Sequence, residues 1–127
     1  MTDNQLLARI LKRVSYWRKA IPIDPRWKIS VELGDPDQET YGDLALSVET
    51  WEARITFSRE LAAPDNHRRI DRVVLHEMLE LADWETATLF WTLAETTDGE
   101  KILTKLYGAA RNRFIEGLLP LLLEKTA

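Results

Sequence analysis

The hydrophobic residues of the first twenty positions recur at spacings of three and four, the period of an amphipathic helix. They are Leu6, Leu7, Ile10, Leu11, Val14 and Trp17. Thr2 and Gln5 have the spacing of a capping box, in which each side chain satisfies a backbone amide at a helix start. Pro22 and Pro25 cannot continue a helix, so the pattern predicts an N-terminal helix that ends before them.

Three short segments with alternating or β-branched residues follow, and they predict strands at residues 27–33, 44–49 and 51–57. Such half-buried strands need a helical layer on one face. From residue 66 to residue 84 the hydrophobic period returns to that of a helix. One arc of this helix is apolar, with Val74, Leu75, Met78, Leu79, Leu81 and Ala82. The opposite, polar arc holds Arg69, Arg72, His76, Glu77, Glu80 and Asp83.

The pattern of the last third of the chain also predicts helices. Residues 85–95 form a separate, mainly apolar segment, and residues 100–127 predict one long helix with a kink or an end at Pro120. The inward-facing residues expected on the long helix are Ile102, Leu103, Leu106, Phe114 and Leu118. With no repeat and no linker, we expect one α+β domain over residues 1–127.

Composition limits the classes of function. The chain has 127 residues, 17 Lys and Arg against 21 Asp and Glu, and a net charge of −4, which argues against nucleic acid as a main partner. It has no cysteine, so disulfides, thiolate metal sites and a cysteine nucleophile are excluded. We see neither a signal peptide nor an apolar run of the roughly 20 residues that cross a bilayer. We therefore expect a cytoplasmic protein that is not bound to membranes.

The segment His76 to Glu80 carries the candidate chemistry. On a helix His76 and Glu80 project from the same side, so an imidazole and a carboxylate could bind one metal ion. Glu77 lies about 100° around the helix, near enough to hold a water bound to that ion. Zinc would lower the pKa of this water, and the Glu77 carboxylate could accept its proton and pass it to a leaving amine.

Residues 70–81, with the sequence IDRVVLHEMLEL, resemble the active-site helix of zincin metallopeptidases, whose motif is His-Glu-x-x-His. In length and element order the chain is similar to the minigluzincins and related small metallopeptidases of phages and prophages. The resemblance implies a zincin-like fold and a zinc-dependent peptidase that acts on a peptide or protein substrate. It also implies that the strand at 51–57 forms the upper rim of a cleft, where an extended peptide adds as a further strand, while 44–49 lies deeper in the sheet.

In this family a glutamate on the helix after the motif supplies the third zinc ligand. The resemblance places that role on Glu100, with Glu95 as the second choice. The second histidine of the motif is replaced by Glu80, and a set of one histidine and two glutamates also suits manganese or magnesium. Tyr107 lies two turns beyond Glu100 and could stabilise an oxyanion.

Each assignment has an alternative. His76 and Glu80 could form a solvated ion pair on the polar arc. Glu100 could complete a capping box with Thr97, and Tyr107 could pack at the edge of the core. As a whole, the chain could be a zincin-fold binding or structural module that has lost its metal. It could also be an interaction protein without zincin ancestry, in which His76 and Glu80 face open solvent. The tryptophans and the apolar C-terminal run would suit a homodimer.

Overall fold

The computed structural model describes residues 1–21, 23–35 and 40–94, with only the backbone for 85–94. It also describes residues 108, 111–113, 115–116, 119–120 and 123. The chain forms two compact units, residues 1–82 and residues 83–127, and each is described by itself. The elements of the first unit define an α+β fold, with an N-terminal helix, a three-stranded mixed sheet and a second helix.

The N-terminal helix α1 spans Asp3–Ala20, as the sequence predicts. The Thr2 hydroxyl accepts a hydrogen bond from the amide of Gln5 at 3.2 Å, and Oε1 of Gln5 accepts one from the amide of Thr2 at 2.9 Å. These two bonds satisfy amides that have no partner within the helix, so the predicted capping box is confirmed. The helix ends just before Ile21, whose extended backbone is typical of a residue that precedes proline.

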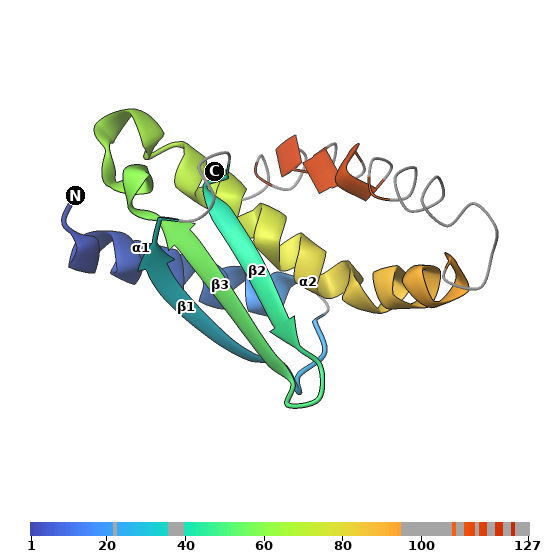
Figure 1. Ribbon diagram of the computed structural model, residues 1–127. Helices are drawn as coiled ribbons and strands as arrows, with labels where there is room; N and C mark the ends of the chain where they lie inside the picture. Colours follow the sequence, from blue (N-terminus) through green and yellow to red (C-terminus); the bar gives the residue numbers. More distant parts are fainter. Residues whose placement is uncertain are drawn as a thin grey trace. The chain divides into compact units, whose positions relative to one another are not determined.

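The sheet contains three strands in the order β1-β3-β2 (Figure 1). They are β1 (Lys28–Gly34), β2 (Gly42–Ser47) and β3 (Glu52–Ser58). β1 pairs with β3 in parallel, and β2 pairs with β3 antiparallel. All three strands lie within two residues of their predicted bounds.

The central strand is β3, which is contrary to the expectation from the resemblance. We expected residues 51–57 at the rim of a cleft and residues 44–49 deeper in the sheet, but β2 is an edge strand and β3 lies between its two neighbours. Alternation along a strand indicates which face is buried, but not which strands are adjacent. The parallel pairing of β1 with β3 takes one side of β3, so the hairpin partner β2 remains outside.

Two short 3₁₀ helices, Arg59–Ala62 and Pro64–Asn66, connect the sheet to the second helix. This helix, α2, spans Arg69–Ala94 without interruption. The helical state predicted for both 66–84 and 85–95 is confirmed over Arg69–Ala94. The predicted division into two segments is wrong, since no proline or glycine between residues 85 and 94 breaks the ladder of backbone hydrogen bonds.

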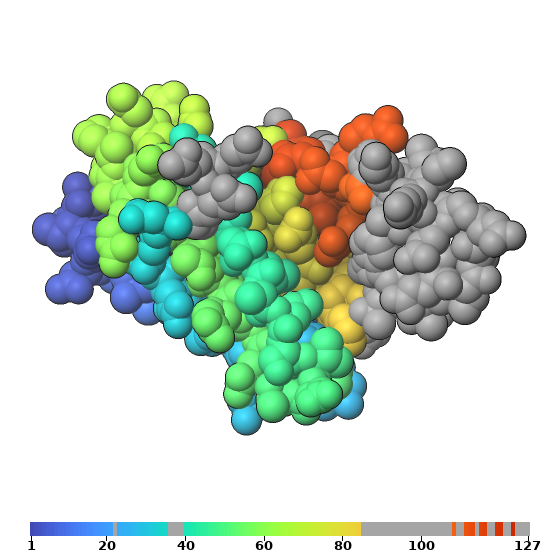
Figure 2. All heavy atoms as spheres, in the orientation of Figure 1, coloured from blue at the N-terminus to red at the C-terminus, as the bar shows by residue number. Residues whose placement is uncertain are grey.

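In the first unit, α1 and the part of α2 up to residue 82 cover one face of the sheet, behind the strands in the view of Figure 1. The core fills the space between them, and its members are Leu6, Ile10, Val14, Trp17, Ala53, Ile55, Phe57, Ile70, Val74, Leu75, Met78 and Leu81. The opposite face carries exposed side chains at alternate positions, and the strands lie at the molecular surface there (Figure 2). The predicted helical layer on one face is confirmed.

In the second unit, the described residues from 108 to 123 are helical. Nε of Arg111 lies 2.6 Å from Oδ2 of Asp83, and this ion pair joins the helical segment to α2 within the unit. Ile115 and Leu119 are buried. The five residues expected to face inward on the C-terminal helix lie outside the described residues. Among the helices of the described part, none has the length and apolar character needed to cross a membrane.

Candidate metal centre

The first half of α2 positions the candidate ligands. Five of its residues are fully buried, namely Ile70, Val74, Leu75, Met78 and Leu81. Because side chains four residues apart project from one side of a helix, this packing fixes the rotation of α2 and places His76 and Glu80 together beside the core.

His76 and Glu80 contact each other directly. Nε2 of His76 lies 3.1 Å from Oε1 of Glu80, and the two side chains are 20% and 29% exposed. These side chains are largely covered, although the interpretation without zincin ancestry expects them in open solvent. The geometry therefore argues against that interpretation and agrees with a shared polar site.

Glu77 is buried, which the polar arc of the sequence did not predict. Only 5% of this residue is exposed, and its Oε2 has no hydrogen-bond partner among the described residues. A buried carboxylate oxygen without a partner is costly, because desolvation is not offset by a new bond. The assignment of Glu77 to the polar arc opposite the core is therefore wrong.

Burial changes the chemistry of Glu77. The pKa of this carboxyl is raised to about 8, mainly by desolvation and next by the negative charge of Glu80. A hydrogen bond with Glu80 and the charge of Asp43 also raise the pKa, while the charge of His76 lowers it. At neutral pH the Glu77 side chain is therefore a carboxylic acid in the protein without metal.

Gly42, at the start of β2, allows the strand to approach Glu77. A Cβ added at Gly42 would lie 3.1 Å from Oε1 of Glu77 and 3.0 Å from Cγ1 of Val73. Any other residue at this position would press on the buried carboxylate. Sequence reasoning missed Gly42. The available signal was a glycine two residues before the predicted strand at 44–49, since a glycine in or beside a strand often marks a close approach between chain segments.

The ligand atoms of His76, Glu77 and Glu80 lie within 4.8 Å of one another. Imidazole nitrogen and carboxylate oxygen are ligands that zinc accepts, and two carboxylates also suit manganese and magnesium. A cation at this cluster would give the orphaned Oε2 of Glu77 a partner and would favour its charged form. The donor set therefore fits a divalent cation.

Three further residues were predicted for the site. Glu100, the expected third ligand, its alternative Glu95, and Tyr107 lie outside the described residues. The predicted capping box of Thr97 and Glu100 lies there too. Of the predicted site, the described part of the chain brings together His76, Glu77 and Glu80.

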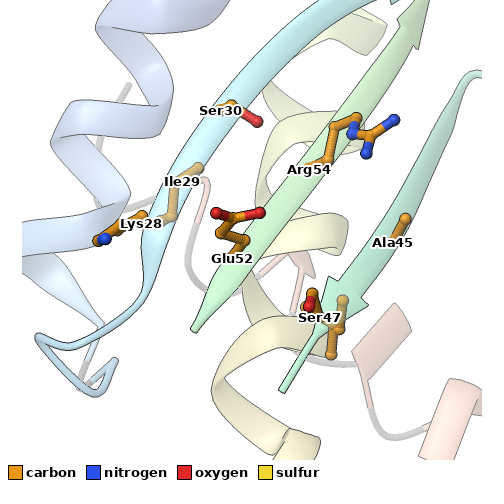
Figure 3. Close-up of a pocket in the computed structure, with 8 residues that line it drawn as sticks. Lys28, Ile29, Ser30, Ala45, Ser47, Glu52 and Arg54 are labelled. Carbon is orange, nitrogen blue, oxygen red and sulfur yellow. The ribbon is translucent and has the colours of Figure 1, made fainter. Parts of the chain in front are cut away.

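A separate pocket lies on the open face of the sheet and has a volume of about 300 Å³ (Figure 3). It is lined by Lys28, Ile29, Ser30, Ala45, Leu46, Ser47, Glu52 and Arg54. Glu52 is the one carboxylate in this lining, and histidine is not part of it. The pocket therefore lacks the donor set of the cluster on α2.

The fold and the cluster together define an α+β protein with a candidate metal centre of one histidine and two glutamates. Comparison with known proteins adds no relative: no family model matches the sequence, and neither a curated protein nor a solved structure matches it. The geometry of the cluster is therefore the basis for a candidate function.

Proposed function

We propose that this chain is a small zinc-dependent peptidase of zincin-like fold, in which His76 and Glu80 bind the metal. The observation that carries the proposal is the convergence of the His76, Glu77 and Glu80 ligand atoms within 4.8 Å. One of the three, Glu77, is buried and has an orphaned oxygen. A cation stabilises such an arrangement, because it offsets the cost of two neighbouring carboxylates in a poorly solvated site.

Glu77 is the proposed general base. When bound, zinc supplies Lewis acidity that lowers the pKa of a water ligand toward neutrality. The Glu77 carboxylate accepts the proton of the attacking water and delivers it to the leaving amine of the peptide bond. A base with a pKa near the working pH is best suited to both steps, and burial moves the Glu77 pKa upward from the usual range of a carboxyl.

The edge strand β2 is the proposed peptide-binding element. The carbonyl of Tyr41 accepts a hydrogen bond from the amide of Ser58, so in the antiparallel ladder Gly42, Leu44 and Leu46 direct their amides and carbonyls away from β3. No described strand pairs with this edge. An extended peptide could add there as a further strand, and Gly42 would bring it next to Glu77.

The third metal ligand remains Glu100 in this proposal, with Glu95 as the alternative, and Tyr107 remains the group that stabilises the oxyanion. The glutamate at position 80 makes the site harder than one with two histidines, so manganese or magnesium could replace zinc.

The test combines metal analysis with a cleavage assay. We expect protein purified without chelator to contain about one zinc per chain and to cleave unstructured peptides. Glu77→Gln should retain the metal and lose about 100-fold or more in kcat, because a general base typically contributes that much. Glu60→Gln, which changes an exposed carboxylate outside the cluster, is the matched control and should keep both properties.

Metal-free protein that stays inactive when zinc is added would refute the peptidase. Equal activity of wild-type protein and Glu77→Gln would refute the role of Glu77 while leaving metal binding intact.

A second candidate function is a zincin-fold binding or structural module that has lost its metal. The hydrogen bond between His76 and Glu80, together with the raised pKa of Glu77, favours it, because a protonated Glu77 reduces the charge of the cluster without a cation. This candidate predicts metal-free protein on purification and weak zinc binding on titration.

A further inference from the structure

Arg69 and Tyr41 form a pair at the beginning of α2 and next to the beginning of β2. Nη1 of Arg69 donates a hydrogen bond to the Tyr41 hydroxyl at 2.9 Å, and Cζ of Arg69 lies 5.3 Å from the centroid of the Tyr41 ring. Arg69 is exposed, and among the described residues no carboxylate forms an ion pair with it. A neutral partner therefore orients the guanidinium, and none of the described carboxylates compensates its positive charge.

This pair belongs to the same contact between strand and helix as the metal cluster. Tyr41 directly precedes Gly42, and Gly42 lies against Val73 and Glu77. Arg69, Val73 and Glu77 follow one another at intervals of four residues, so they lie along one side of α2. Eight residues of helix separate Arg69 from Glu77, which corresponds to about 12 Å along the axis.

We propose that Arg69, positioned by Tyr41, binds the C-terminal carboxylate of the peptide that lies along β2. The inference rests on the proposed function and specifies its substrate class, namely peptides with a free C-terminus. Nε and Nη2 of Arg69 are not used by Tyr41, and a guanidinium binds a carboxylate through two such donors. A distance of about 12 Å equals three to four residues of extended chain, so cleavage is expected about three residues from the C-terminus.

The alternative role of Arg69 is purely structural, since its bond to Tyr41 also ties α2 to the segment before β2. The two roles differ in one measurable respect. A structural tie affects every peptide equally, whereas a carboxylate-binding residue distinguishes a free C-terminus from an amidated one.

The experiment compares two peptides of identical sequence, one with a free C-terminus and one with a C-terminal amide. We expect the zinc-loaded wild-type protein to cleave the free form with a kcat/KM about tenfold or more higher than that for the amidated form. A hydrogen bond between charged groups typically contributes enough free energy for such a ratio. Arg69→Gln should bring this ratio to about one, with little change for the amidated peptide. Arg68→Gln removes the neighbouring exposed arginine and should keep the wild-type ratio.

A binding measurement separates this inference from the peptidase proposal. The affinities of both peptides are measured by calorimetry for Glu77→Gln and for the double variant with Arg69→Gln. Cleavage of both peptides at equal rates would overturn the role of Arg69 and leave the peptidase intact. Binding that prefers the free carboxylate and depends on Arg69, without any cleavage, would support the inference and overturn the peptidase. If the protein neither cleaves the peptides nor binds the free carboxylate in preference to the amide, both proposals are overturned.

Discussion

Gly42 lies so close to Glu77 that a Cβ added to the glycine would be 3.1 Å from Oε1 of the carboxylate. Gly42→Ala should therefore displace the Glu77 side chain, destabilise the protein by about 1–3 kcal/mol and weaken zinc binding about tenfold or more. Urea unfolding and zinc titration measure the two effects. Gly108→Ala is the control, because nothing lies within 4 Å of its added Cβ. Equal stability and zinc affinity of both variants would contradict the close approach.

The pKa of Glu77 makes stability depend on pH. Burial, together with the negative charge of Glu80, raises this pKa from 4.5 to about 8, so between these values the folded protein holds a proton that the unfolded chain releases. The folded state then binds more protons than the unfolded state, and stability falls as pH rises from about 4.5 to about 8. Glu77→Gln removes this dependence. In EDTA we expect the free energy of unfolding of the variant to exceed that of wild type by on the order of a few kcal/mol at pH 9. At pH 5 the two free energies should differ little.

Urea midpoints at the two pH values, with and without the substitution, measure this linkage. Zinc bound at His76 and Glu80 should reduce this difference in stability at high pH, because the nearby cation stabilises the charged Glu77 carboxylate and does not stabilise the neutral amide in the same way. A difference between variant and wild type that is the same at both pH values would show that Glu77 titrates normally.

Glu80→His should strengthen zinc binding. The substitution restores the His-Glu-x-x-His pattern and replaces a hard oxygen ligand by an imidazole, which zinc prefers over magnesium or manganese. We expect about a tenfold or greater decrease in the zinc Kd, with a weaker response to magnesium. Glu32→His, on the open face of the sheet, controls for the addition of a surface histidine. If Glu80→His binds no zinc, the cluster is neither a metal site nor the remnant of one.

The ion pair between Arg13 on α1 and Asp71 on α2 should stabilise the packing of the two helices. Nε of Arg13 lies 2.8 Å from Oδ1 of Asp71, and the side chains are 21% and 35% exposed. Asp71 also lies in the first turn of α2, where a negative charge is favourable. Asp71→Asn should cost about 1 kcal/mol of unfolding free energy, after allowance for solvent screening.

The measurement is urea unfolding at low salt and in 1 M NaCl, where the effect of Asp71→Asn should shrink. Asp65→Asn is the control, because it changes an exposed carboxylate before α2. This substitution should change the free energy of unfolding little under either condition. A loss that is equal at both salt concentrations would indicate a cause other than charge.

Local interactions made much of this protein predictable. The capping box of Thr2 and Gln5 and the three strand segments follow from contacts between residues near in sequence. The contact between His76 and Glu80 is of the same kind, because any helix brings residues four apart to one side.

The tertiary structure alone decided which strand lies at the edge and which polar residues of α2 are buried. Alternation indicates the faces of a strand but not its neighbours, so the sequence could not place β2 outside β3. The helical pattern of the sequence places Glu77 on the polar arc. In the structure Gly42 packs closely against this side chain, which is buried and has a raised pKa. Arg69 and Tyr41 are 28 residues apart, and only the packing of helix against strand brings them into contact.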